Sequence, residues 1–392
     1  MTFVVAGLRC GGIERAVVSL IEGLVARGHQ ISLVTFSAAE TDFFHLPAGV
    51  PRTQSAYRDD AAPQRSVFTT PYSRLKRLQR AIAATGPHVV VAHAPQINVP
   101  TLLALRGSRI PVIVTEHGDV PIRPDAARPD LWKKWLWYRL RRLCYPRAFQ
   151  VVSASEAIER NFAWLPAERR TIIHNPFQPA RAELQPMQLP TGLAAGRPWL
   201  VSMGRLSHAK GFDVLLAAFA RIAARFPEWQ LLILGDGELR EQLRRQALAS
   251  IAADQVIFAG ALPQPFALLQ RAKIFVMASR YEGFPMAHGE ALSCGLPVIA
   301  TDCPSRPLQS REGTIAGGVR ELVRDGVDGV LVPCEDPAAL ATAMAELIED
   351  PDKRQRLAQE AAPGMNRYSC ARIVATWEAL LKRADPGAAG AR

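Results

Sequence analysis

Two glutamates lie eight residues apart around a Gly-Phe-Pro turn, in the segment from Tyr281 to Glu290. The segment follows a predicted strand and opens a predicted helix, so Glu282 should stand in the loop and Glu290 about two turns into the helix. Backbone N–H groups left free at the helix start, after Gly283, can hold phosphate oxygens. A carboxylate further along can accept hydrogen bonds from a ribose diol. Taken alone, the pair could also be two solvated glutamates on a surface helix.

Two cations, Arg205 and Lys210, lie at another predicted strand–loop–helix junction. Such a pair can neutralise a pyrophosphate, most of all when the pyrophosphate becomes a leaving group. A Walker P-loop is excluded, because it needs Gly directly before the Lys and Ser or Thr directly after it, where this chain has Ala209 and Gly211. Solvated charges at a helix start are the commoner explanation when no other feature supports a site.

Two glycines and a histidine end two predicted strands in the first half of the chain. Gly11 and Gly12 would let the backbone approach a ligand closely, although a tight strand–helix turn explains them equally well. They are not a dinucleotide fingerprint, since Gly-x-Gly-x-x-Gly is absent. His117 stands between Glu116 and Gly118 at a strand end, where a lone histidine is more often structural.

The elements that must position these groups alternate as strands and helices in two series. Short Val/Ile-rich runs without polar alternation are typical of strands buried on both faces of a parallel sheet. The first series predicts strands at Phe3–Leu8, Gln30–Phe36, His88–His93, Pro111–His117, Phe149–Ser153 and Thr171–His174, with helices that include Ile13–Arg27 and Tyr72–Ala84. The second predicts strands at Trp199–Met203, Gln230–Leu234, Val256–Ala259, Ile274–Ala278, Pro297–Thr301 and Gly329–Val332, with a helix at Phe212–Phe226.

The two series indicate an α/β fold of two doubly wound, Rossmann-like domains facing a cleft. A chain of 392 residues suits two cores. Five prolines between residues 176 and 198 break the pattern and predict a linker. We expect domains at 1–177 and 198–366, a linker at 178–197, and a final helix with a tail at 367–392. Ligands of such sheets bind at the carboxyl ends of strands. Two Rossmann proteins fused in tandem would give the same pattern.

The string from Glu282 to Thr301 resembles the Glu-x7-Glu signature of family-4 retaining glycosyltransferases, which have the GT-B fold. Three further blocks agree with that family in order and spacing: Gly11–Ala16, Gly204–Gly211 and Leu234–Arg240. Each block alone is a weak signal, but the set is specific and extends over almost the whole chain. The resemblance implies that the second domain binds a nucleotide sugar and that the final helix returns to the first domain.

The resemblance also assigns roles to single residues. It places Arg205 and Lys210 on the donor diphosphate and Glu290 on the ribose. Glu282, with the backbone from Gly283 through Phe284 to Met286, would contact the transferred sugar and the phosphates. Gly11 and Gly12 would approach the donor from the first domain, and His117 matches a histidine beside the donor sugar.

The implied reaction is sugar transfer with retained anomeric configuration. No Asp or Glu is evidently placed as a nucleophile, so the resemblance implies front-face attack, with the leaving phosphate taking the acceptor's proton. The chain departs from the family at an apparent insertion, Ser310–Gly318, close to the donor end of the expected site. The donor therefore stays open, with a UDP-sugar favoured over a GDP-sugar.

No obligatory metal or other cofactor is expected. Asp350-Pro351-Asp352 matches the Asp-x-Asp metal motif of other glycosyltransferases, but it falls between two predicted helices, where Asp and Pro serve as cap and turn residues. The other histidines show no metal-ligand spacing; they are His29, His45, His88, His93, His174, His208 and His288.

The net charge of +11 is concentrated in the first half. Residues 1–180 carry 23 Lys/Arg against 13 Asp/Glu, whereas residues 181–392 carry 24 against 23. Residues 131–147 hold six cations, no acid and three of the seven tryptophans. A helical wheel places Trp132, Trp135, Leu136, Leu140 and Leu143 on one face, and Lys133, Lys134, Arg141 and Arg142 with Trp137, Tyr138 and Tyr145 on the other.

Two interpretations of this segment remain open: a core-packed helix with a solvated face, or a peripheral surface for an anionic membrane, which mixed Trp, Tyr and basic residues suit. No motif supports nucleic-acid binding. Six scattered cysteines and the lack of a long apolar run predict a cytoplasmic protein, peripheral on the cytoplasmic face of the inner membrane.

The whole pattern predicts a retaining, metal-independent hexosyltransferase that passes a sugar from a nucleotide-sugar donor to a saccharide acceptor in surface polysaccharide biosynthesis. The acceptor would be a growing or lipid-linked saccharide, for instance on polyprenyl diphosphate. Two alternatives stay open: a glycosyltransferase with a small soluble acceptor, and a sugar-nucleotide-binding protein without turnover.

Overall fold

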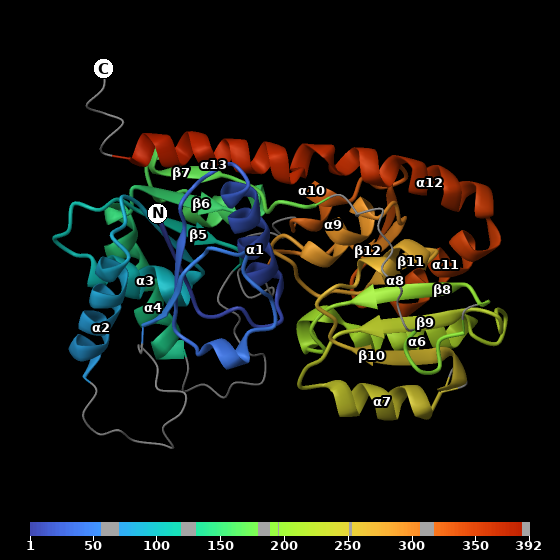
Figure 1. Ribbon diagram of the computed structural model, residues 1–392. Coiled ribbons are helices and arrows are strands. Elements are labelled where there is room, and N and C mark those ends of the chain that lie inside the picture. Colours follow the sequence, from blue (N-terminus) through green and yellow to red (C-terminus); the bar gives the residue numbers. More distant parts are fainter. Residues whose placement is uncertain are drawn as a thin grey trace. The chain divides into compact units, whose positions relative to one another are not determined.

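The computed structural model describes residues 1–55, 70–118, 131–178, 189–194, 196–250, 253–305 and 317–385. The chain forms two compact units (Figure 1). The first comprises Met1–Pro176 and Cys370–Arg392, and the second comprises Phe177–Ser369. Much of the expected linker, residues 179–188 and 195, lies outside the described residues.

The first unit contains a parallel sheet with the strand order β3-β2-β1-β4-β5-β6-β7. All six expected strands are present, although each is shorter than expected. The edge strand β3 was not expected, because its three residues lack an apolar run. The bounds are β1 (Thr2–Val5), β2 (Ser32–Thr35), β3 (Arg52–Gln54), β4 (Val90–His93), β5 (Val112–Glu116), β6 (Gln150–Ser153) and β7 (Arg170–Ile172).

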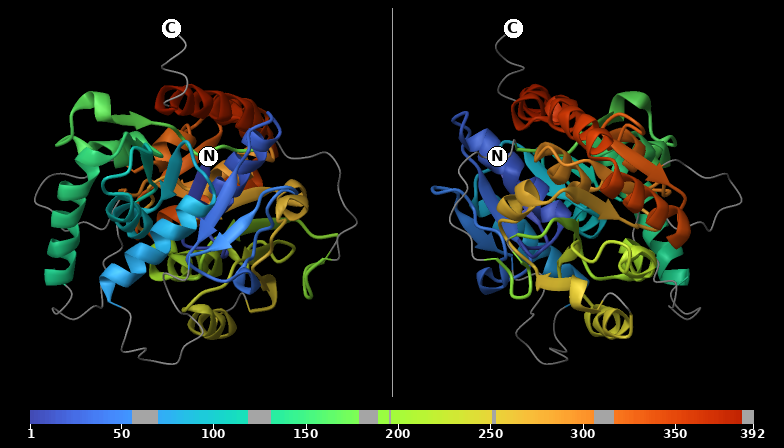
Figure 2. Two further views of the ribbon diagram at one scale, coloured as in Figure 1. Left: turned by 60° about the vertical axis from the view of Figure 1, so that its left-hand side comes forward. Right: turned by 90° about the vertical axis from the view of Figure 1, so that its right-hand side faces the viewer.

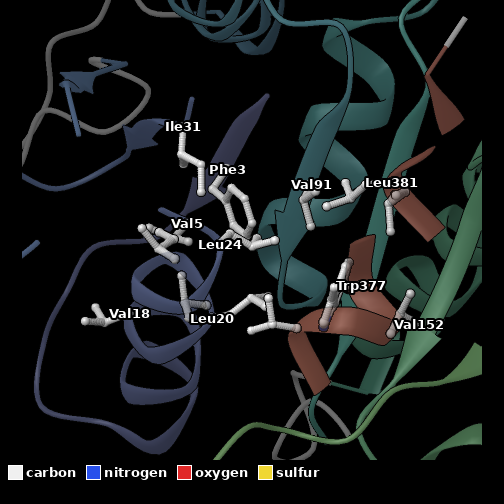
Figure 3. Packing of buried hydrophobic residues seen from close by; sticks show 14 of the residues in the cluster. Phe3, Val5, Val18, Leu20, Leu24, Ile31, Val91, Val152, Trp377 and Leu381 are labelled. Atoms are coloured by element: carbon white, nitrogen blue, oxygen red, sulfur yellow. The ribbon is translucent and has the colours of Figure 1, made fainter. Parts of the chain in front are cut away.

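The helices of the first unit are α1 (Gly12–Val25), α2 (Pro71–Ala84), α3 (Pro95–Ala104), α4 (Leu131–Cys144), α5 (Glu156–Glu159) and α13 (Cys370–Ala384). Gly23 lets α1 approach α13 closely, since a Cβ there would lie 2.5 Å from Val374 Cγ2. Trp377 and Leu381 of α13 join Phe3 of β1 in one buried cluster (Figure 3). The last helix is therefore part of the first unit's core, although the second unit separates the two in sequence.

The second unit contains a parallel sheet with the order β10-β9-β8-β11-β12-β13. Its strands are β8 (Trp199–Met203), β9 (Gln230–Leu234), β10 (Val256–Gly260), β11 (Ile274–Met277), β12 (Val298–Thr301) and β13 (Gly329–Val332). The prediction of two consecutive doubly wound, Rossmann-like domains is thus confirmed.

The helices of the second unit are α6 (Phe212–Ile222), α7 (Arg240–Leu248), α8 (Phe266–Arg271), α9 (Met286–Ser293), α10 (Val319–Leu322), α11 (Pro337–Glu349) and α12 (Pro351–Gly364). Helix α6 ends at Ile222, before the expected Phe226. Pro227 disfavours the helical conformation of the residue before it, and the chain leaves the helix in the preceding turn.

Helix α4 contradicts the helical wheel. Arg141 and Tyr145, expected on the solvated face, are 4% and 0% exposed, whereas Trp135 and Leu143 are 59% and 62% exposed. Arg141 Nη2 lies 3.2 Å from Glu116 Oε2, and the Tyr145 hydroxyl donates to the same carboxylate. A fully buried carboxylate needs such partners. The wheel is therefore wrong for these four residues, whereas Arg142 and Tyr138 are exposed as it predicted.

The outer side of α4 exposes aromatic and apolar side chains together with Arg139 and Arg142, and the helix stands at the left edge of the left view in Figure 2. The side chains of Trp132, Lys133 and Lys134 lie outside the described part of the structure. Of the helices that the structure describes, none is both long enough and apolar enough to cross a membrane.

Candidate active site

Both glutamates of the Glu-x7-Glu segment are buried. Glu282 lies in the loop between β11 and α9, and Glu290 lies in α9; each is 7% exposed. Burial contradicts the interpretation of two solvated glutamates, because an ionised carboxylate leaves water only where partners compensate for its lost hydration.

Glu282 accepts two hydrogen bonds on one oxygen. Lys210 Nζ lies 2.6 Å from Glu282 Oε1, and Ser279 Oγ donates to that oxygen at 2.7 Å. Burial raises the pKa of Glu282, but the Lys210 charge, His288 and these hydrogen bonds outweigh it and leave the pKa below its ordinary value. Glu282 is therefore ionised at neutral pH, and Lys210 reaches it from another strand end.

The loop after β8 carries Lys210 to this position. Lys210 ends a short 3₁₀ turn, and Gly211 follows it with φ of 60°, a conformation that favours glycine. A Cβ at Gly211 would lie 1.9 Å from the Ala278 carbonyl oxygen, at the end of β11. Glycine at this position therefore lets the Lys210 loop pack directly against the end of β11, the strand that precedes Glu282.

Arg205 lies in the same loop, and its residue is exposed. Within the described residues, no hydrogen bond or ion pair engages its side chain. A guanidinium available to solvent can form a bidentate contact with a phosphate.

Helix α9 begins at Met286 without a side-chain cap, so its first N–H groups have no such partner. The Phe284 and Met286 side chains are buried, 6% and 8% exposed. The Phe284 ring packs 6.0 Å from Phe177 and 5.6 Å from Tyr368, between ring centroids. This aromatic cluster fixes the turn that precedes the helix.

Gly289 and Phe177 form a contact that the sequence did not reveal. A Cβ on Gly289 would lie 2.2 Å from Phe177 Cζ, so only glycine lets the ring rest against α9. The available signal was a glycine in the interior of a short predicted helix, which often marks a close approach. The contact anchors the helix that carries Glu290.

His288, in the same helix, was also missed as a member of the site. Its residue is 1% exposed, and within the described residues neither ring nitrogen has a hydrogen-bond partner. Burial lowers the pKa of His288 to about 4; the charge of Glu282 opposes this shift and that of Lys210 adds to it. A neutral imidazole therefore lies beside the Lys210–Glu282 pair.

The end of the apparent insertion touches the Glu282 turn. Gly318 N donates to the Glu282 carbonyl oxygen at 3.3 Å, and a Cβ on Gly318 would lie 2.0 Å from the Gly283 carbonyl oxygen. Residues 306–316, with most of the insertion, lie outside the described residues. The described end of the insertion is thus in backbone contact with the candidate site.

In the first unit, Gly11 lies at the end of the loop that follows β1, and Gly12 is the first residue of α1. Gly11 is the residue before the helix, and a Cβ there would lie 2.2 Å from Glu14 Oε2. Residues 6–11 separate the two elements, so the structure does not show the tight strand–helix turn, and a ligand role of these glycines stays a prediction.

His117 directly follows β5 at the carboxyl edge of the first unit's sheet. It lines a small cavity together with His93, Thr115 and Asn175. Burial lowers the pKa of His117 to about 4, and Asn175 partly offsets this shift. His117 is neutral at physiological pH and can act only as a neutral donor or acceptor.

Asp350 has the structural role that its position predicted. Its side chain caps α12 by accepting from Lys353 N at 2.7 Å. Within the described part of the chain, no group of three or more His, Cys, Asp or Glu side chains could hold a metal ion.

Comparisons with known proteins agree with this architecture. Residues 11–176 match the glycosyl transferase 4-like domain, and residues 189–363 match the glycosyl transferases group 1 family. A relative from Campylobacter jejuni, an α-1,4-N-acetyl-D-galactosaminyltransferase named for a saccharide on diphospho-undecaprenol, is 25% identical over 97% of this chain and 98% of its own.

Solved structures share the fold over nearly the whole chain. Alr3699/HepE of Anabaena, in complex with UDP and glucose, has a TM-score of 0.73 at 21% identity and covers 97% of this chain and 99% of its own. WaaG, a glycosyltransferase involved in lipopolysaccharide biosynthesis, has a TM-score of 0.71 at 15% identity, with 97% and 98% covered. With a glycosyl transferase 4-like domain followed by a glycosyl transferases group 1 domain, the chain belongs to the glycosyltransferases of the GT-B fold.

Proposed function

We propose that this glycosyltransferase is a retaining, metal-independent hexosyltransferase that uses a nucleotide-sugar donor, with a UDP-sugar favoured. The observation that carries the proposal is the ion pair between the partly exposed Lys210 and the buried Glu282, beside the uncapped start of α9. It combines a cation for a departing phosphate, a helix N-terminus for phosphate oxygens, and a carboxylate for sugar hydroxyls.

In this proposal the donor diphosphate lies on Arg205, Lys210 and the first N–H groups of α9. Glu290 accepts hydrogen bonds from the ribose, and Glu282 orients the transferred sugar. The acceptor hydroxyl attacks from the face that the diphosphate leaves, and the departing phosphate takes the proton. Lys210 and Arg205 stabilise the negative charge that develops on the leaving group, where an oriented cation has its largest effect.

The acceptor is proposed to be a growing or lipid-linked saccharide in surface polysaccharide biosynthesis. The Campylobacter relative, which aligns over 97% of the chain, is named for a saccharide on diphospho-undecaprenol. The exposed Trp135, Leu136, Tyr138 and Leu143 of α4 would suit contact with a bilayer that carries such an acceptor. The protein would then work peripherally, on the cytoplasmic face of the membrane.

Metal independence is a testable part of the proposal. In this proposal Arg205, Lys210 and a helix N-terminus neutralise the phosphate charge, so turnover should persist in excess EDTA. The measurement is donor turnover in EDTA, with Mg²⁺ or Mn²⁺ added back to a parallel sample. If EDTA abolished turnover and either metal restored it, a metal ion would be shown to neutralise the diphosphate charge.

The experiment that tests the function has two steps. UDP-, GDP- and ADP-sugars are first screened by thermal shift, and the stabilising donor is then offered with lipid-linked and soluble saccharides. We expect stabilisation by a UDP-sugar and a product whose anomeric proton coupling matches that of the donor. An inverted product would exclude the retaining reaction.

The same assays separate the alternatives. Transfer only to soluble saccharides would favour a small acceptor. Donor binding without hydrolysis or transfer would favour a binding protein without turnover, although the complete set of Arg205, Lys210, Glu282 and Glu290 argues against it.

A further inference from the structure

Arg280 lies in the loop after β11, two residues before Glu282, and its side chain reaches the loop that carries Lys210. Arg280 Nη1 donates to the His208 carbonyl oxygen at 2.8 Å, and Arg280 N donates to the Ala209 carbonyl oxygen at 2.8 Å. Both acceptors belong to the short 3₁₀ turn that ends at Lys210. One residue therefore binds this turn through its backbone and through its side chain.

The same guanidinium also holds the first turn of α6, which follows Lys210 in the chain. Arg280 Nη1 lies 2.9 Å from Asp213 Oδ1, and Arg280 Nη2 lies 2.7 Å from Asp213 Oδ2. Such a bidentate pair is strong and fixes the relative orientation of its partners. Burial raises the pKa of Asp213, but the hydrogen bonds and the charge of Arg280 outweigh it and leave the pKa below its ordinary value. The backbone is thus fixed on both sides of Lys210.

A third contact of Arg280 reaches the loop after β13. Glu335 forms an ion pair with Arg280 Nε, and its φ is 56°. This conformation costs a non-glycine residue energy and persists only where its surroundings impose it. Arg280 therefore joins the loops that follow β8, β11 and β13, all at the carboxyl edge of the second unit's sheet. Its side chain is only 13% exposed.

The position of the Lys210 ammonium depends on this arrangement. Lys210 Nζ lies 2.6 Å from Glu282 Oε1, so the ion pair joins the two loops that Arg280 also joins. A lysine side chain is flexible, and its ammonium is located only as well as the backbone that carries it. Gly211 leaves no room for a Cβ against the Ala278 carbonyl oxygen. The two loops thus fit closely, and a displacement of one moves Lys210 away from Glu282.

We propose that Arg280 is a positioning residue for sugar transfer, which holds the backbone on both sides of Lys210 and so places the ammonium where it can meet both Glu282 and the donor diphosphate. Arg280 acts through Lys210 and not by a contact of its own with the donor. The inference rests on the proposed function for the role of Lys210 in the reaction. The contacts of Arg280 belong to the free protein, and their effect on the loop can be measured without a donor.

The first experiment measures the order of the Lys210 loop in the full-length chain. Backbone hydrogen–deuterium exchange of residues 207–213 is compared by mass spectrometry in wild type, Arg280→Gln and Arg225→Gln. Arg225 pairs with Glu349 elsewhere in the same unit, so its variant is the matched control. We expect faster exchange of 207–213 in Arg280→Gln and no change there in the control. Unchanged exchange of this segment in Arg280→Gln would overturn the proposal.

The second experiment asks whether Arg280 acts through Lys210. Values of kcat and KM are measured for Arg280→Gln, Lys210→Ala and the double variant, with the donor that the thermal-shift screen identifies. Lys210 meets charge that develops on the leaving group, so Arg280→Gln should lower kcat at least about 10-fold and change the KM for the donor much less. In the Lys210→Ala background, the same substitution should cost almost nothing. Equal losses in both backgrounds would assign Arg280 a purely structural role and overturn the proposal.

A second variant keeps the test independent of the folding of the first. Asp213→Asn weakens the same bidentate pair from the side of α6, and it should reproduce both the faster exchange and the loss of kcat. Wild-type turnover in Lys210→Ala would overturn the proposed function of Lys210, and with it the role of Arg280. An impaired Lys210→Ala beside a fully active Arg280→Gln would leave the proposed function intact and overturn this inference alone.

Discussion

The single positive charge of Lys210 serves two anionic groups in the proposed reaction. In the structure it pairs with the buried Glu282 carboxylate, and in the proposed reaction it also meets the leaving diphosphate. The ammonium has three donors, so it can hold the carboxylate and a phosphate oxygen together. Arg205, in the same loop and exposed, can approach the phosphate without giving up an ion pair.

Replacing either cation should lower turnover strongly. We expect Lys210→Ala and Arg205→Ala each to lower kcat by about 10²-fold or more, because each removes a charge contact to the departing diphosphate. Arg244→Ala, an exposed arginine on α7, is the matched control and should retain activity. The measurement is steady-state transfer with circular dichroism to verify folding. Near wild-type turnover in both site variants would contradict the assignment.

Spacing along the chain was enough to predict part of the candidate site. Glu282 and Glu290 stand out because a strand, a Gly-Phe-Pro turn and a helix lie in one short segment. His288 and Arg280 were missed, since neither residue gives a local sign of its surroundings. The partners of Arg280 lie in the loops after β8 and β13 and in α6, and only the three-dimensional fold brings them together.

At the scale of elements, two glycines hold the Glu282 turn and the helix that follows it. Gly289 accommodates Phe177, and Gly318 fits against the Gly283 carbonyl group. Neither position has room for a Cβ, so the geometry of the turn depends on residues that carry no functional side chain. In the sequence, the signals are Gly289 in the interior of a short predicted helix and the apparent insertion that ends at Gly318.

Adding a methyl group at Gly318 should therefore impair the site. We expect Gly318→Ala to displace the Glu282–Gly283 backbone, lower kcat/KM by at least about 10-fold, and cost roughly 1–3 kcal/mol of stability through overpacking. The control is Gly196→Ala, where a Cβ meets nothing within 4 Å. Activity and thermal unfolding are measured for both. Indistinguishable kinetics of the two variants would show that the turn tolerates the shift.

The sequence predicted most strands of both sheets but assigned the wrong faces to α4. Strand prediction succeeded because buried parallel strands are continuous apolar runs. The wheel assumed that charge faces solvent, whereas the buried Glu116 draws Arg141 and Tyr145 inward. The Glu116 carboxylate, which belongs to β5, thus determines which side chains next to it are buried. The sequence of residues 131–147 alone does not contain that information.

For the whole molecule, three histidines among the described residues make stability depend on pH: the buried His93 and His288 and the half-buried His117. The pKa values of His93, His117 and His288 are all lowered by burial, the latter two to about 4. Between about pH 4 and 6.5 the unfolded chain then binds more protons than the folded one, so the free energy of unfolding rises with pH and levels off above that range.

Urea denaturation at pH 5, 6 and 7 checks this expectation. His288→Leu should flatten the rise, since it removes one group that must stay neutral when folded, and the exposed His88→Gln should not. A free energy of unfolding that falls from pH 5 to pH 7 would contradict the expected direction.

The charge distribution bears on where the protein works. The first 180 residues carry nearly all of the net positive charge, and α4 adds exposed Trp135, Leu136 and Leu143. Arg139 stacks on Trp135 at 4.7 Å, so a cation and an aromatic ring share one surface. Basic and aromatic groups together suit the headgroup region of an anionic bilayer.

We expect the protein to sediment with anionic but not with neutral liposomes, and salt to weaken this binding, because exposed charges are screened beyond about 8–10 Å at ordinary ionic strength. Arg139→Gln with Arg142→Gln should remove the salt-sensitive part, and Trp135→Ser with Leu143→Ser the salt-resistant part. Arg141 stays unchanged, since its loss would leave Glu116 buried without its cation.

Arg244→Gln with Arg245→Gln removes equal charge from α7 as the control. Equal binding to both lipids, or the same loss in the control, would exclude α4 as the membrane surface, and a small soluble acceptor would then become the better proposal.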